Sequence, residues 1–178
     1  PFEAACVLVR DRRAHREAFA LTPEYLEKTE RGLASGALWF SEYGLQLSRG
    51  FRALKVWLSI KEHGLDRFGR LIDRNIAQAH ELAALVQAEP DLELLAPVAT
   101  NIVCFRYDPG GLSDEQLNAL NEELLIRLHE SGIAAPSYTT LDGRYCLRAA
   151  IVNYRTTSAD LPVLVGAVRE IGASLPRP

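Results

Sequence analysis

The sequence predicts an α/β protein that ends in a small α+β domain with a four-stranded, mainly antiparallel sheet. After residue 66 the hydrophobic periodicity changes in the order helix, two strands, helix, two strands, helix. Turn signals separate these segments, namely the DPGG sequence at 108–111 and the hairpin signal Asp142-Gly143. Such an order is typical of an antiparallel sheet with helices on one face.

The first 65 residues predict less regular structure. The apolar run at residues 4–9 predicts a short buried strand that leaves the core at the charged residues 10–13. Residues 14–20 predict a short helix. Residues 21–46 show no clear period and contain Pro23 and several glycines, so they predict a long loop. Long loops inside compact regions are often functional.

Two helices are predicted next. Helical spacing of apolar residues from Leu47 to Leu58 predicts a helix that Ser48 caps and Gly64 ends. Asp66 is the predicted cap of a second helix, and Pro90 ends it. The apolar stripe of this second helix consists of Phe68, Leu71, Ile72, Ile76, Ala79, Leu82, Leu85 and Val86.

The remaining elements complete the small domain. Residues 92–98 and 101–107 predict one strand pair, and residues 133–139 and 144–152 predict another. Ser113 and Gln116 form a capping box for a helix that ends at Gly132. Thr157 or Ser158 is the predicted cap of the last helix. The buried faces of these two helices are Leu117, Leu120, Leu124 and Leu128, and Leu161, Leu164, Val165, Val168 and Ile171.

Composition excludes several classes of function. The 178 residues are 48% hydrophobic and 24% charged, as in ordinary globular proteins. A net charge of −3 argues against a general nucleic-acid or membrane surface, and no apolar run is long enough to span a bilayer. Three widely spaced cysteines without a CxxC pair favour small buried side chains in a reducing compartment. We therefore expect a cytoplasmic protein.

Known catalytic and metal motifs are missing. The histidines, His15, His63, His80 and His129, stand apart without the i, i+4 spacing of a metal site. The sequence contains no GxSxG, GxxxxGK[ST] or GxGxxG motif. We expect no metal site.

Two features remain as chemical candidates. In SRGFRALK, residues 48–55, the side chains of Arg49, Arg52 and Lys55 place three cations at the predicted start of a helix. They could hold an anion together with free main-chain amides, or form an ordinary solvated basic face. Tyr25, in LTPEYLEKTERGL, is the second candidate. By composition alone, an isolated loop tyrosine is more often a packing residue than an acid or base.

Four stretches together resemble a known family: VLVRD at 7–11, LTPEYL at 21–26, QLSRGFRALKVWLSIKEHG at 46–64 and RYCLRAAIVNYRTT at 144–157. They resemble the C-terminal part of the group II pyridoxal-phosphate-dependent amino acid decarboxylases, which include aromatic L-amino acid and glutamate decarboxylases. The resemblance extends over essentially the whole chain, and SRxFRALKxW is its most specific part. It implies the PLP-dependent transferase fold type I. Residues 1–65 would end the PLP-binding large domain, with the catalytic loop at about 21–46, and residues 66–178 would form the small C-terminal domain.

The resemblance also implies roles for individual residues. Tyr25 matches the tyrosine that a mobile loop brings to the active site, where its hydroxyl protonates Cα after carbon dioxide leaves. Members with Phe at this position tend toward aldehyde-producing chemistry, so Tyr25 favours simple decarboxylation. Ser48, contributed across the dimer interface, matches a position near the cofactor phosphate and the substrate ring. Arg49 and Arg52 match the arginines of the same motif, which are either structural or phosphate-side residues. Phe2 matches an aromatic position in the substrate pocket. Arg148 matches a strand arginine that serves as an internal tie.

The resemblance implies that the chain is a fragment. The family's Schiff-base lysine lies in an Asp-x-His-Lys-Trp motif a few residues before the strand that opens this chain, and Lys28, Lys55 and Lys61 do not match it. We expect the fragment alone to be inactive. The parent would be a homodimeric carboxy-lyase that uses pyridoxal 5'-phosphate to convert an L-amino acid, expected to be aromatic, to its amine and carbon dioxide.

Three alternatives stay open at this point. The parent could be an aldehyde synthase, an acidic amino acid decarboxylase on the same fold, or a non-catalytic degenerate paralogue. Gly50 stands where many members of the family have a second arginine, which removes one positive charge from the motif.

Overall fold

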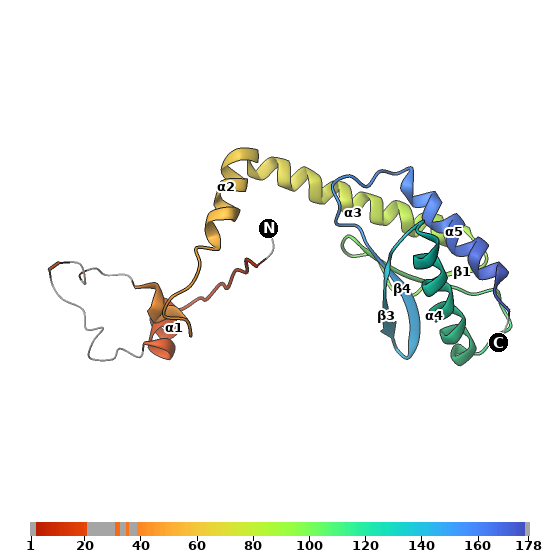
Figure 1. Ribbon diagram of the computed structural model, residues 1–178, viewed down its shortest axis with the longest axis horizontal. Coiled ribbons are helices and arrows are strands. Elements are labelled where there is room, and N and C mark those ends of the chain that lie inside the picture. The colour runs from red at the N-terminus through yellow and green to blue at the C-terminus, as the bar shows by residue number, and fades with distance from the viewer. Residues whose placement is uncertain (1–2, 21–30, 33–34, 36–38, 177–178) are drawn as a thin grey trace. The chain divides into compact units, whose positions relative to one another are not determined.

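The computed structural model describes residues 3–20, 31–32, 35 and 39–176, and it divides into two compact units, residues 1–64 and 65–178. Figure 1 shows the elements of each unit in chain order. Within the described part of the chain, none of the helices combines the length and the apolar character that crossing a bilayer requires.

The second unit contains the predicted four-stranded sheet. Its strands are β1 (Leu92–Leu94), β2 (Ile102–Tyr107), β3 (Ser137–Leu141) and β4 (Arg144–Ala150), in the order β1-β2-β4-β3. Every neighbouring pair is antiparallel, so the predicted sheet is confirmed. Asp142 and Gly143, with φ values of 50° and 79°, close the β3–β4 hairpin as their sequence predicts.

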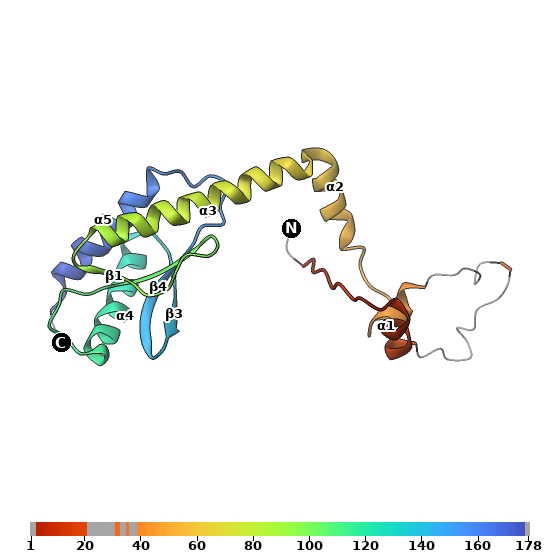
Figure 2. The same cartoon turned by 180° about the vertical axis from the view of Figure 1, so that it is seen from behind.

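One face of this sheet packs against three helices: α3 (Leu65–Ala88), α4 (Asp114–Ser131) and α5 (Asp160–Ser174). Figures 1 and 2 show the unit from opposite sides, with α4 next to β4. The strands bury alternate residues, which include Val103, Phe105, Leu147 and Ala149. The helices contribute Leu82, Val86, Leu124, Leu128, Val165 and Val168 to the same core. Burying each large apolar side chain stabilises the unit by about 1.5–3 kcal/mol.

Polar contacts fix α4 on the sheet. The Ser113–Gln116 capping box forms as predicted, and Gly132 ends the helix with a left-handed φ of 70°. The amide of Asn121 is fully buried. Its oxygen accepts a hydrogen bond from the main-chain N–H of Tyr107 on β2, and its nitrogen donates to the carbonyl of Tyr107, both at 2.8 Å. These bonds join α4 to the end of β2.

Two helix starts in the second unit differ from the predictions. Asp66 does not cap α3, because the helix begins one residue earlier; the carboxylate lies in the first turn, where it favours the helix dipole. Ala159 precedes α5 without a side-chain cap, so the predicted caps Thr157 and Ser158 are wrong. Instead, the carboxylate of Asp160 accepts hydrogen bonds from the N–H and hydroxyl of Thr157 at 2.8 and 3.0 Å.

The first unit contains α1 (Arg12–Phe19), the 3-10 helix η2 (Phe40–Tyr43) and α2 (Ala53–His63). The predicted short helix is confirmed as α1, with its start at residue 12 because the carboxylate of Asp11 accepts from two main-chain N–H groups of its first turn. Gly64, with a φ of 75°, ends α2 as predicted.

The predicted buried strand at residues 4–9 is wrong. These residues form no strand, and Leu8 is 92% exposed. A strand needs a neighbour to accept its main-chain hydrogen bonds, and the described residues of this unit provide none. Among those residues Glu42 alone is buried, so the described residues of this unit form no apolar core.

Candidate active-site segment

Two of the predicted site residues lie outside the described part of the chain. They are Tyr25, the predicted proton donor, and Phe2, predicted to line the substrate pocket. The helices that precede and follow Tyr25 in the described part of the chain are α1 and η2, which contact each other. The guanidinium of Arg16 in α1 binds the carboxylate of Glu42 in η2 through two hydrogen bonds of 2.7 and 3.0 Å. The hydrogen bond to Glu42 is the main reason that the pKa of Arg16 is raised.

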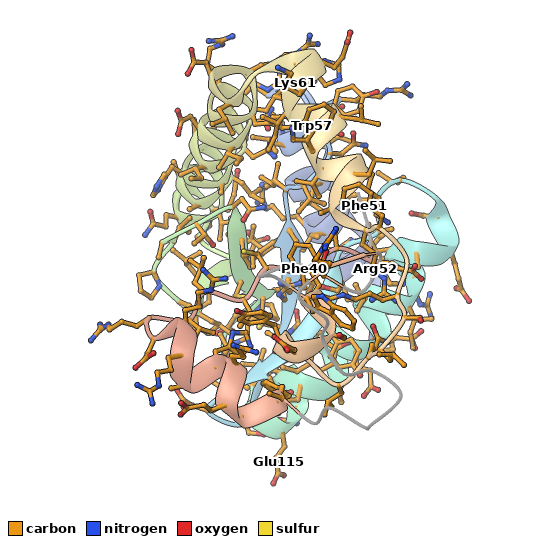
Figure 3. All side chains as sticks on the ribbon, turned by 90° about the vertical axis from the view of Figure 1, so that its left-hand side faces the viewer. Phe40, Phe51, Arg52, Trp57, Lys61 and Glu115 are labelled. Carbon is orange, nitrogen blue, oxygen red and sulfur yellow. The ribbon has the colours of Figure 1, made fainter. Side chains whose placement is uncertain are left out.

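Ser48 and Arg49 lie in the irregular segment between η2 and α2, and both are exposed. The prediction that Ser48 caps the helix is wrong, because α2 begins at Ala53 and its N-cap is Arg52. Arg52 has helical φ and ψ values and makes no side-chain cap bond. Of the three predicted cations, Lys55 therefore lies in the first turn, Arg52 at the cap, and Arg49 before the helix. Figure 3 shows Arg52 beside Phe51 at this end of the unit.

Arg49 turns back toward the end of η2. One of its terminal nitrogens lies 3.9 Å from the position that a Cβ atom on Gly44 would take. Within the described residues, neither Ser48 nor Arg49 has a hydrogen bond or an ion pair. A hydroxyl and a guanidinium are donors that suit phosphate oxygens. These two residues therefore fit the phosphate end of pyridoxal phosphate by their chemistry and their accessibility.

Several large apolar side chains just before α2 and within it are exposed to solvent. They include Phe51, Trp57 and Leu58, and Phe51 is 73% exposed. Figure 3 shows Phe51, Trp57 and Lys61 in succession along α2 and the residues before it. The ammonium of Lys61 lies 5.9 Å from the centre of the Trp57 ring. An exposed apolar series of this kind marks an interaction surface.

The second unit contains a charged cluster that was not predicted. Arg106 on β2 is only 4% exposed, and its guanidinium contacts Glu93 at 2.7 Å and Asp114 at 2.8 Å. Burial disfavours its charge, but the hydrogen bonds to these carboxylates outweigh burial and raise the pKa of Arg106. The sequence could have indicated the Arg106–Glu93 pair, because these two residues lie in strands that are predicted to be neighbours.

Arg148, which the resemblance implies is an internal tie, is hydrogen-bonded to Ser137 on the neighbouring strand β3. It donates to the hydroxyl of Ser137 at 3.4 Å, and no carboxylate of the described residues binds it. It lines a cavity of about 550 Å³ together with the start of α5 and residues 133–137. Arg106 provides a further tie, from β2 to Glu93 on β1 and to Asp114 on α4.

The cysteines and histidines form no common site in the described residues. No group of three or more metal-binding side chains occurs there. Cys146 is buried, Cys104 is half-buried, and Cys6 is exposed, so the expectation of burial fails for Cys6. Burial, together with the neighbouring Cys104, raises the pKa of the Cys146 thiol to about 11. A buried thiol of this kind is inert rather than nucleophilic.

Comparisons with known proteins agree with the resemblance. The chain is 36% identical over 162 residues to an aromatic-L-amino-acid decarboxylase from Bacillus atrophaeus, a match that covers 90% of this chain and 34% of that protein. It is 31% identical over 150 residues to a phenylacetaldehyde synthase from Arabidopsis thaliana, covering 84% of this chain and 30% of that protein. The chain thus spans about a third of the length of these relatives.

A solved structure shares the fold. The crystal structure of tryptophan decarboxylase from Catharanthus roseus, in complex with L-tryptophan, matches with a TM-score of 0.68 and 25% identity, over 76% of this chain and 29% of that one. The predicted fold is therefore confirmed. A profile of the family described as the pyridoxal-dependent decarboxylase conserved domain matches residues 1–108. The chain belongs to this family of pyridoxal-dependent decarboxylases.

Proposed function

We propose that this chain is part of a PLP-dependent carboxy-lyase that converts an aromatic L-amino acid to its amine and carbon dioxide. The observation that carries the proposal is the family match over residues 1–108, which includes Tyr25, Ser48 and Arg49. The name of the Bacillus atrophaeus relative supports an aromatic substrate. Residues 1–65 would end the cofactor-binding large domain, and residues 66–178 would form the small domain.

The proposed chemistry divides between the cofactor and the side chains. Pyridoxal phosphate supplies the electron sink when the α-carboxylate leaves. Ser48 and Arg49 bind on the phosphate side, where an exposed hydroxyl and guanidinium without described partners can donate hydrogen bonds. Phe2 lines the substrate pocket. Tyr25 donates a proton to Cα, and exclusion of water makes this neutral phenol an effective acid.

The exposed apolar surface of the first unit supports an obligate assembly. Val7, Leu8, Leu45, Phe51 and Trp57 are all more than half exposed. Apolar area gains about 25 cal/mol per Å² when it is removed from water. We infer that the rest of the large domain and a second copy of the protein cover this surface, so that the enzyme is a cytoplasmic homodimer.

The full-length protein tests this proposal. Purified protein loaded with pyridoxal phosphate would be incubated with phenylalanine, tyrosine, tryptophan, histidine and glutamate, and carbon dioxide and amine would be measured. We expect equal amounts of both products from at least one aromatic amino acid. Carbon dioxide release from glutamate alone would identify the protein as an acidic amino acid decarboxylase. If a protein with an intact Schiff-base lysine released no carbon dioxide from any of these amino acids, the proposed decarboxylation would be contradicted.

An aldehyde synthase is the second candidate, favoured by the similarity to phenylacetaldehyde synthase. Tyr25 supports the amine, because the resemblance associates Phe at this position with aldehyde formation. Aldehyde, ammonia and hydrogen peroxide in equal amounts, formed with consumption of dioxygen, would select the synthase.

The polypeptide of residues 1–178 provides a separate test. Lys28, Lys55 and Lys61 do not match the family's lysine position, so we expect no decarboxylation by this polypeptide with added cofactor. A full-length protein that lacks the Schiff-base lysine would instead be a degenerate paralogue.

A further inference from the structure

The second unit contains a cavity of about 550 Å³ where residues 133–137, the end of β4 and the start of α5 meet. The described residues that line it fall between positions 82 and 164, within this unit. Its volume is in the range of about 300–1,000 Å³ that is typical of small-molecule sites. The proposed decarboxylation assigns no role to this cavity.

The wall of the cavity is mainly apolar. Leu82 on α3, Ile151 after β4 and Leu161 on α5 belong to the hydrophobic core and are at most 7% exposed. Ile133 and Val163 also line the cavity, but they remain 51% and 55% exposed. An apolar group in the cavity would remove this exposed area from water, which is favourable. The wall therefore suits a ligand with an apolar body.

Arg148 is a charged side chain of the wall that lacks a counter-ion in the described part of the chain. It is half-buried on β4, and the hydrogen bond of its guanidinium, from Nη1 to the hydroxyl of Ser137, is long at 3.4 Å. A guanidinium has five N–H donors, so most donors of Arg148 remain available. A half-buried cation of this kind favours an anionic ligand, because charges removed from water need a partner.

Asp160 brings a negative charge to the same wall, but its carboxylate is already engaged. It accepts hydrogen bonds from the main-chain N–H and the hydroxyl of Thr157 at 2.8 and 3.0 Å. It also lies in the first turn of α5, where the helix dipole stabilises a negative charge. The charge of the wall that still needs a partner is therefore the positive charge of Arg148.

We propose that this cavity binds a small carboxylate with an apolar body. The carboxylate pairs with the guanidinium of Arg148, and the apolar part lies against Ile133 and Val163. A planar guanidinium holds a carboxylate through two parallel hydrogen bonds, which gives Arg148 the counter-ion that it lacks. The inference does not rest on the proposed function, because it uses none of the residues assigned to the cofactor, the substrate or proton transfer.

Phenylpropionate is a suitable probe, because it joins one carboxylate to one apolar ring. Phenylpropionamide is a neutral analogue of nearly the same shape, and inorganic phosphate is an anion without an apolar body. Each is titrated into an isotope-labelled polypeptide of residues 1–178 and followed by NMR. We expect phenylpropionate to bind with a Kd below about 1 mM and to shift the signals of Ile133, Leu161 and Val163. The amide and phosphate should bind about tenfold more weakly or worse.

Two arginine variants separate a local pairing from a general effect of charge. Arg148→Gln should weaken phenylpropionate about tenfold and leave the amide unchanged, so that the two ligands bind this variant alike. Arg127→Gln is the matched control, because Arg127 lies on α4 in an ion pair with Glu123 at 2.7 Å and does not line the cavity. It removes the same charge and should leave both affinities within about twofold of wild type.

A third variant keeps the test decisive if Arg148→Gln does not fold. Ala135 is an exposed residue of the cavity wall, so Ala135→Trp fills the cavity with an indole while Arg148 is retained. It should abolish phenylpropionate binding and leave the signals of the core residues in place. Equal wild-type affinities for phenylpropionate and its amide would overturn the pairing with Arg148, and equal affinity for phosphate would overturn the need for an apolar body.

The full-length, cofactor-loaded protein provides the final count of sites. Equilibrium dialysis with labelled phenylpropionate should find one site fewer per chain in Arg148→Gln and in Ala135→Trp than in wild type or Arg127→Gln. An active site that also binds the probe contributes equally to all four proteins and does not change this difference. The same number of sites in all four proteins would refute the proposed site, whether or not the enzyme proves to be a decarboxylase.

Discussion

Replacing Asn121 by alanine should destabilise the second unit more than any other exchange of one polar side chain on α4. The Asn121 amide satisfies both the N–H and the carbonyl of Tyr107, each at 2.8 Å, in a fully buried position. Without it, two main-chain groups lose their partner where water does not reach. An unsatisfied buried group costs about 1–3 kcal/mol, so we expect a loss of about 2–6 kcal/mol in the free energy of unfolding.

The assay is urea unfolding of a polypeptide of residues 65–178, which contains a core of its own. Asn118 is the matched control, because it is also on α4 and also bridges to main-chain groups, those of Gly143 at 2.8 Å and Tyr145 at 2.7 Å. It is half-buried, so water can replace its bonds, and Asn118→Ala should cost about 1 kcal/mol. Equal losses for the two variants would refute the argument from burial.

Three further predictions concern the proton donor, a helix contact and a thiol. Tyr25→Phe in the full-length enzyme should abolish amine formation and allow aldehyde to form with dioxygen; unchanged amine production would remove Tyr25 from the mechanism. Gly172→Ala should destabilise residues 65–178 by about 1–3 kcal/mol in urea unfolding, because the added Cβ would lie 2.7 Å from the Tyr107 ring. Gly166→Ala, with nothing within 4 Å, should be neutral or stabilising. The Cys146 thiol ionises near pH 9 when unfolded but has a raised pKa of about 11 when folded. The unfolded chain therefore loses its proton first, so stability should fall between about pH 9 and 11, and Cys146→Ala should flatten that fall.

Local signals explain which parts of the fold could be predicted. The capping box of α4 lies within four consecutive residues, and the Asp142-Gly143 turn lies within two. Both formed as predicted because the interactions that determine them are close in sequence. The predicted start of α2 was wrong for the opposite reason. Ser48 is of a residue type that often caps helices, but whether a helix begins there depends on neighbours outside the local pattern.

The candidate site could be predicted less well, because its contacts are distant in sequence. Arg16 and Glu42 each look like ordinary surface charges in the sequence, and only the fold brings them together across 26 residues. The strand expected at 4–9 has the right composition but no partner in the described part of its unit. Family resemblance, rather than periodicity, gave Tyr25, Ser48 and Arg49 their predicted roles.

The two units differ in how they obtain stability, and this difference bears on function. The second unit encloses its own core, with Phe105, Leu124 and Leu147 fully buried. The first unit buries only Glu42 among its described residues and relies there on polar contacts such as Arg16–Glu42. Regions with few buried apolar contacts open at lower free energy than the core of a domain. The apolar side chains that the first unit exposes, such as Leu8 and Phe51, are therefore expected to need the cover that the proposed assembly supplies, whereas the second unit needs none to form its core.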